Sequence, residues 1–129
     1  MVVFMVALKN TKTNNNMKTV IVISLQVEGL HFWESCDLKE VMFLKNKHRH
    51  IFHIKCKKEV SHADRETEII LFKRKIVDFL HLTFDNGSGV LDFDGMSCEM
   101  IASVLVGKFN LHSCEVLEDN ENGAEVFNG

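Results

Sequence analysis

The sequence predicts a single α+β domain in which an antiparallel sheet of four strands carries two helices on one face. Length and composition fit one globular domain, because the chain has 129 residues, of which 46% are hydrophobic and 26% charged, and one hydrophobic core usually serves about 100–150 residues. Two segments in the second half have helical periodicity. Strand patterns precede and follow these segments, and this order is typical of α+β proteins.

The domain is expected to begin near Met17. Residues 9–16, Lys-Asn-Thr-Lys-Thr-Asn-Asn-Asn, are a polar tract that offers nothing to bury. Residues 1–16 are therefore expected to be a disordered extension, and residues 17–129 the domain. A cleavable signal peptide is not expected, because no basic region precedes the apolar residues 1–8.

Two strands are expected in the first half. Residues 20–27, Val-Ile-Val-Ile-Ser-Leu-Gln-Val, are rich in β-branched side chains, which favour strands. Residues 50–58 place His50 and the apolar side chains that follow it at alternate positions, and this period of two indicates a half-buried strand. His48 has the parity of His50, so both imidazoles are expected on the same side of the sheet.

Two helices are expected in the second half. An apolar stripe near the helical period of 3.6 runs through residues 61–82, and either Ser61 or Asp64 is suited to cap its start. The second helix is expected over residues 97–109, with Ser97 as its N-cap. The remaining strands of the sheet are expected at residues 113–118 and 124–127.

Composition excludes several classes of protein. The longest apolar run is far shorter than the roughly 20 residues of a membrane-spanning helix. With 15 basic and 18 acidic residues the net charge is -3, which removes the electrostatic basis for bulk nucleic-acid binding. The four cysteines form no C-x-x-C pair and fit neither a zinc ribbon nor a disulfide framework, so a cytoplasmic protein with reduced thiols is expected.

The placement of three histidines is the most informative feature. His48-x-His50 puts two imidazoles roughly 6.6–7 Å apart on one strand face, which suits two ligands of one metal ion. His31, at the end of the first strand, would supply a third ligand if the two strands are neighbours. Three protein ligands and an open position are the arrangement of catalytic zinc. The alternative is a solvated, hydrogen-bonded pair, which is the more frequent role of an H-x-H spacing in a basic segment.

The order of these residues resembles the T-fold enzymes of pteridine metabolism, 6-pyruvoyltetrahydropterin synthase and 6-carboxytetrahydropterin synthase. In that family the first strand ends in a histidine, the second opens with H-G-H, and the three histidines hold zinc. Here His31, His48 and His50 occupy those places, with Arg49 where glycine is usual. Two more segments are similar to the family's P-T-x-E-x-x-A and V-x-V-x-E-T, namely residues 96–102, Met-Ser-Cys-Glu-Met-Ile-Ala, and residues 114–120, Cys-Glu-Val-Leu-Glu-Asp-Asn.

The resemblance implies an anchor for the ligand. In the family, the glutamate of the last segment accepts two hydrogen bonds from the 2-amino and ring N–H edge of a pterin. The matching residue is Glu118, and Glu99, from the helix entry, is a second ligand-binding candidate. Guanine has the same edge, so such an anchor does not choose between a pterin and a purine-like ligand. Without the resemblance, Glu118 is one more acid in an acidic tail.

The family's proton-transfer residues are not found in this chain. Its cysteine, four residues before H-x-H, is Leu44 here, and its Asp-His dipeptide does not occur. Cys36, His81 and Asp85 are the candidates to act as acid and base in their place.

Three functions stay open. The first is a zinc-dependent lyase or synthase that acts on a pterin, and the second is a protein on the same fold that binds a guanine-type base or nucleotide. In the second case the basic strand, with Arg49, Lys55 and Lys57, would be available to phosphates, although a solvated face is its more frequent role. The third is a small α+β interaction module without a metal. The resemblance also implies a homo-oligomer, in which sheets join edge to edge into a barrel and the sites lie between subunits.

Overall fold

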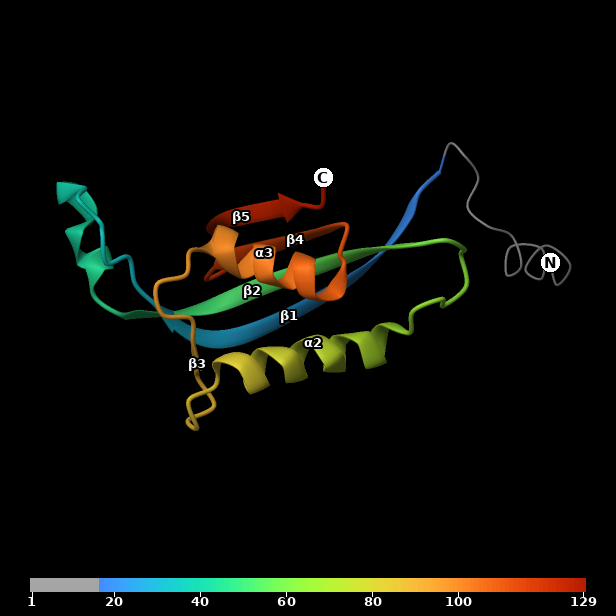
Figure 1. Ribbon diagram of the computed structural model, residues 1–129, viewed down its shortest axis with the longest axis horizontal. Coiled ribbons are helices and arrows are strands. Elements are labelled where there is room, and N and C mark those ends of the chain that lie inside the picture. Colours follow the sequence, from blue (N-terminus) through green and yellow to red (C-terminus); the bar gives the residue numbers. More distant parts are fainter. Residues whose placement is uncertain (1–16) are drawn as a thin grey trace, which may run out of the picture.

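The computed structural model describes residues 17–129, which form an α+β domain around one mixed sheet (Figure 1). The extension expected over residues 1–16 lies outside the described residues. No helix within the described part is long and apolar enough to cross a lipid bilayer. The chain forms, in order, β1 (Thr19–His31), the 3-10 helix η1 (Lys39–Lys45), β2 (His48–Val60), α2 (Ile69–Phe84), β3 (Leu91–Asp92), α3 (Cys98–Phe109), β4 (Ser113–Glu118) and β5 (Asn122–Phe127).

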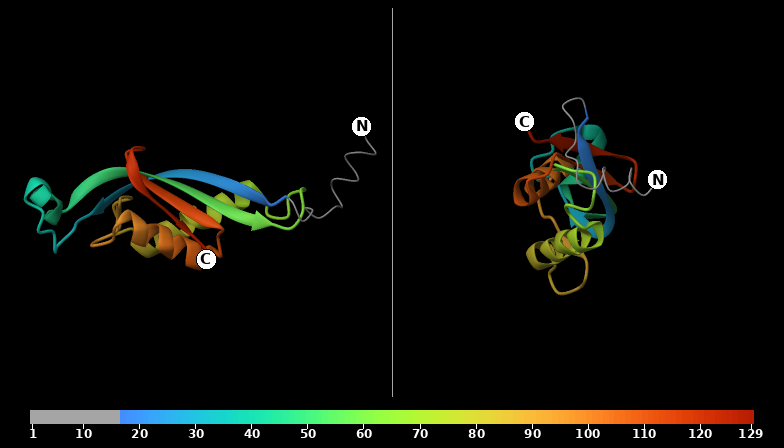
Figure 2. Two further views of the ribbon diagram at one scale, coloured as in Figure 1. Left: turned by 90° about the horizontal axis from the view of Figure 1, so that it is seen from above. Right: turned by 90° about the vertical axis from the view of Figure 1, so that its right-hand side faces the viewer.

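The two longest strands of the sheet, β1 and β2, form an antiparallel hairpin at its centre. Each strand has 13 residues, and the register runs from Thr19 opposite Val60 to His31 opposite His48. The hairpin is curved and extends past both long helices, and η1 lies at its far end (Figures 1 and 2). The end of the hairpin that carries the histidines is therefore next to η1.

The sheet differs from the expected one because it has five strands in the order β3-β1-β2-β4-β5. The prediction of four antiparallel strands was wrong in this respect, since β3 pairs in parallel with Gly29 and Leu30 of β1. A strand of two residues, Leu91 and Asp92, is too short to produce a hydrophobic alternation. The helix η1 was also not predicted, because its seven residues are fewer than a helical stripe needs.

The hydrophobic core lies between one face of the sheet and the two long helices, as the sequence predicts. Phe52 and Ile54 of β2 are buried in the same cluster as Ile76 of α2 and Leu105 of α3. Both helices lie on the same side of the sheet (Figure 2). All four cysteines are free and buried.

Helix α2 begins at Ile69, so the prediction that Ser61 or Asp64 caps it was wrong. Its N-cap is Glu68, whose carboxylate accepts hydrogen bonds from the backbone N–H groups of Ile70, at 3.1 Å, and Leu71, at 3.0 Å. Glutamate is not among the residues preferred at an N-cap, which explains why the sequence pattern pointed to Ser61 and Asp64 instead.

The substitution Glu68→Ala is expected to lower the melting temperature at pH 7, because two backbone N–H groups lose their acceptor. The hydrogen bonds from Ile70 and then Leu71 hold the pKa of Glu68 below its usual 4.5. Because the lowered pKa belongs to the folded state, this carboxylate stabilises the fold above pH 4.5 and loses that effect as the pH falls through the lowered value. Thermal unfolding between pH 7 and pH 3 should therefore show a difference from wild type that shrinks in acid.

The matched control for this experiment is Asp78→Ala, on an exposed position of the same helix, which is expected to change the melting temperature little. A Glu68→Ala difference that stayed constant down to pH 3 would contradict the capping role.

Candidate metal centre

The hairpin register brings the three predicted histidines together. His31 lies opposite His48, and His50 points to the same face of the sheet. The ring centroids are 4.6 Å apart for His31 and His48, 5.3 Å for His31 and His50, and 5.0 Å for His48 and His50. Glu118 joins them from the end of β4, where the register pairs it with Phe52. One ligand atom from each of the four side chains lies within 4.8 Å of the others, so this group could hold a metal ion.

Each of the three rings is oriented through its Nδ1 atom. A backbone carbonyl or carboxylate oxygen lies within hydrogen-bond distance of every Nδ1. Because these oxygens only accept, Nδ1 is the donor in each contact, and in the neutral form of each ring the lone pair is then on Nε2. This second contact is typical of histidines that bind metals. The acceptors are Met96 O for His31, at 2.9 Å, Asn46 O for His48, at 2.8 Å, and Asp119 Oδ2 for His50, at 2.7 Å.

In a neutral His31 ring, the Nε2 atom faces another hydrogen-bond acceptor, and a cation between the two atoms would remove this repulsion. It lies 2.9 Å from Glu118 Oε2, yet it is the one buried side-chain nitrogen or oxygen without a hydrogen-bond partner among the described residues. With Nδ1 donating to Met96, both facing atoms are acceptors. Burial lowers the pKa of His31, against the opposing effects of the Met96 hydrogen bond and of the Glu118 carboxylate, and the neighbouring His48 and His50 lower it further. The net direction favours the neutral ring. A metal ion bound by both atoms turns this repulsion into two favourable contacts.

Sequence reasoning missed a thiol at this group. Cys98, the first residue of α3, has its Sγ 3.8 Å from Glu118 Oε2 and lines the same cavity of about 390 Å³. Burial first, and the Glu118 carboxylate second, raise the pKa of Cys98 to about 12, so the thiol keeps its proton at neutral pH. One sequence feature could have identified Cys98, namely its position directly after the N-cap Ser97. This position lies in the segment that resembles the pteridine enzymes' helix entry.

The predicted acid and base residues do not meet at this cavity within one chain. Cys36 is buried in the connection between β1 and β2, with its Sγ 3.6 Å from Val41 O. His81 lies at the end of α2 with its Nδ1 3.2 Å from Asp85 Oδ2, beside a separate hollow. None of these three is among the described residues that line the cavity, whereas Glu99 is.

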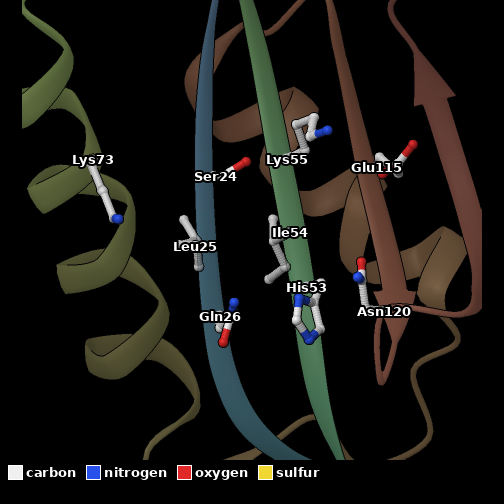
Figure 3. A pocket seen from close by; sticks show the side chains of 9 residues that line it. All are labelled: Ser24, Leu25, Gln26, His53, Ile54, Lys55, Lys73, Glu115 and Asn120. Carbon is white, nitrogen blue, oxygen red and sulfur yellow. The ribbon is translucent and has the colours of Figure 1, made fainter.

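Arg49, Lys55 and Lys57 of β2 lie on the face of the sheet opposite to His48 and His50, because successive side chains alternate between faces. A polar hollow on this face is lined by residues of three strands, with Lys55 and Glu115 beside each other (Figure 3). Each of these basic side chains has an acidic neighbour. Arg49 contacts Glu28, Lys55 lies opposite Glu115, and Lys57 has its Nζ 3.1 Å from Glu125 Oε2.

Neither a family model nor a curated protein matches this chain. A solved structure with a similar fold is that of the uncharacterized protein WS1659 from Wolinella succinogenes, which matches with a TM-score of 0.60 and 15% sequence identity over 88% of this chain and 99% of that chain. At this identity the likeness shows the fold alone. The comparisons do not support the pteridine-enzyme family that the sequence resembles, so membership of that family stays a prediction.

Proposed function

We propose that His31, His48, His50 and Glu118 hold a zinc ion, and that this centre binds a pterin or purine-like heterocycle. The observation that carries the proposal is the buried Nε2 of His31, which faces a carboxylate oxygen and has no hydrogen-bond partner among the described residues. Three imidazole nitrogens and a carboxylate oxygen are ligands that zinc accepts, at about 2.0–2.2 Å. Because the four side chains fill a tetrahedral site, a bound zinc ion would accept an oxygen of the heterocycle only as a fifth ligand, and it would then act as a Lewis acid for that oxygen.

Binding without turnover is the form of this function that we favour. The cavity next to the four side chains is large enough for a bicyclic base, at about 390 Å³, and the histidine pattern resembles that of pteridine enzymes. The acid and base candidates Cys36, His81 and Asp85 are not among the described residues that line it. A lyase or synthase is the second candidate, and it requires these groups to come from a neighbouring copy.

We also propose that copies of the chain join edge to edge into a T-fold barrel. Strand β1 pairs with β3 only at Gly29 and Leu30, so most of that edge has no partner among the described strands, and β5 is the opposite edge. Open edges pair readily with other strands, and two different edges joined head to tail produce a ring. Light scattering measures the mass in solution, and a monomer at working concentration would exclude the barrel.

The metal content per chain tests the centre. Protein purified without a histidine tag is expected to contain about one zinc ion per chain by mass spectrometry of the metal, and the double variant His48→Ala/His50→Ala to contain none. The matched control is His53→Ala/His112→Ala, which removes two histidines outside the group and should keep the zinc. A folded wild-type protein without metal, even after incubation with zinc, would overturn the proposal.

A further inference from the structure

A side chain orients one of the three histidine rings, whereas backbone groups orient the other two. The Nδ1 atoms of His31 and His48 donate to backbone carbonyl oxygens. The Nδ1 atom of His50 instead donates to the carboxylate of Asp119, at 2.7 Å. The orientation of His50 therefore depends on the side chain at position 119, which a substitution can change.

The carboxylate of Asp119 binds β2 at two points. Its Oδ2 accepts from Nδ1 of His50, and its Oδ1 accepts from the backbone N–H of Ile51, at 2.9 Å. The backbone N–H of Asp119 also donates to Ile51 O, at 2.8 Å. The pairing of β2 with β4 ends one residue earlier, at Phe52 opposite Glu118. Asp119 thus prolongs the contact between these strands beyond their last pair.

The tight turn between β4 and β5 determines where this carboxylate lies. Asp119 and Asn120 both have a left-handed backbone, with φ of 53° and 59°, and the N–H of Glu121 donates to Glu118 O, at 2.9 Å. Positive φ at both central residues is the pattern of a type I′ hairpin turn. Asparagine tolerates this backbone as aspartate does, so the turn is expected to persist when asparagine replaces Asp119.

The two acceptor oxygens of Asp119 decide which nitrogen of the His50 ring carries the proton. A carboxylate has nothing to donate, so Nδ1 is the donor, and in the neutral ring the lone pair is on Nε2. This Nε2 atom lies 3.6 Å from Glu118 Oε1, and it is therefore the atom that is available to a cation within the group. A carboxylate behind a histidine also makes the ring a more basic metal ligand.

We propose that Asp119 is a positioning residue of the metal centre, because its carboxylate selects the tautomer of His50 whose Nε2 atom is free to bind the cation. The inference rests on the proposed function, since it requires an ion at the group. It adds a residue that is not one of the four ligand side chains and that acts through His50.

An amide at position 119 has only one acceptor for the two donors. If its oxygen accepts from the N–H of Ile51, its NH₂ group faces Nδ1 of His50, and the proton of the ring moves to Nε2, where it blocks the cation. If the amide is reversed, its NH₂ group faces the N–H of Ile51, and two donors oppose each other. We expect the first arrangement, because it leaves no donor against another donor.

Competition with a chelating dye for zinc tests the proposal. Asp119→Asn is expected to bind zinc about 10–100-fold more weakly than wild type, as is typical when the contact behind a metal-bound histidine is lost. The matched control is Glu121→Gln, which removes one negative charge from an exposed position of the same turn and should keep the zinc affinity near that of wild type. Equal losses in both variants, or no loss in Asp119→Asn, would overturn the proposal.

Long-range proton–nitrogen NMR spectra of the imidazole rings give a readout that a merely structural contact would not change. In the zinc-loaded wild type, His50 is expected to carry its proton on Nδ1 and the metal on Nε2. In metal-free Asp119→Asn, at a pH where the rings are neutral, its proton is expected on Nε2. His48 is the internal reference, because its Nδ1 faces a backbone carbonyl and keeps its proton. A wild-type His50 bound through Nδ1, or an unchanged tautomer in Asp119→Asn, would contradict the role of Asp119.

Zinc content and thermal unfolding of the same samples separate this inference from the proposed function. A folded wild-type protein without zinc overturns the metal centre, and the role of Asp119 with it. Stoichiometric zinc in the wild type with equal affinity in Asp119→Asn overturns the role of Asp119 alone. If Asp119→Asn lowers the melting temperature without metal but leaves the zinc affinity unchanged, the contact with His50 is only structural.

Discussion

Removal of zinc by a chelator is expected to lower the melting temperature of the protein by on the order of 10 °C. The four ligand side chains come from β1, β2 and β4, so the unfolded chain does not hold them together. A ligand that binds only the folded state stabilises it by about 4.1 kcal/mol when its free concentration is about 1,000 times its Kd. Each kcal/mol shifts the melting temperature of a domain of this size by about 4 °C. Circular dichroism with and without a chelator measures the difference.

The double variant His48→Ala/His50→Ala distinguishes a specific effect of the metal from a general effect of the chelator. Its melting temperature should be the same with and without chelator, because the group has lost two of its four ligand side chains. Added zinc should restore the stability of the chelated wild-type protein. Equal melting temperatures for zinc-loaded and chelated wild type would show that no metal is bound at this group.

The strands and the histidine face could be predicted because their signals are local. The alternation in β2 places His48 and His50 on the same face as the buried Phe52, and this parity needs no knowledge of distant residues. His31 required only one further assumption, that two consecutive strands form a hairpin. Ser97 was predicted as an N-cap and is confirmed, because a cap is defined by residues within one turn.

The remainder of the group depends on contacts between distant parts of the chain. Glu118 reaches the histidines because β4 pairs with β2 in a register that puts it opposite Phe52, and no local pattern fixes that register. The resemblance pointed to Glu118 in the role of an anchor for a heterocycle. In the structure its carboxylate oxygen lies 2.9 Å from His31 Nε2, within a group that could hold a metal ion, so the role of anchor stays a prediction beside that of metal ligand.

The choice of cysteine shows the same limit. Cys36 does not match the position of the family's cysteine, and it was a candidate only because a loop between the first two strands could bring it near the histidines. The connection that contains it turns its Sγ towards Val41 O, while Cys98 arrives from α3 and lies 3.8 Å from Glu118. Which thiol lines the cavity depends on α3, an element that follows much later in the chain, and no local pattern around Cys36 or Cys98 shows this.

The substitution Glu118→Gln is expected to weaken zinc binding by about 100-fold and to stabilise the metal-free protein. The amide keeps the size of the side chain but removes the charge that attracts the cation. Its N–H group can also donate to His31 Nε2, the buried acceptor that has no hydrogen-bond partner among the described residues. One satisfied hydrogen bond contributes about 1 kcal/mol, so the melting temperature without metal should rise by a few degrees.

These two effects have opposite signs, and together they distinguish a metal ligand from an anchor for the heterocycle. Competition with a chelating dye measures the zinc affinity, and thermal unfolding in the presence of chelator measures the stability without metal. The matched control is Glu99→Gln, which changes an acid of the same cavity outside the group of four and should leave the zinc affinity near that of wild type. If Glu118→Gln instead keeps its zinc and loses only the binding of guanosine or neopterin, then the carboxylate anchors the heterocycle, as the resemblance to pteridine enzymes implies, and three histidines hold the metal with an open position.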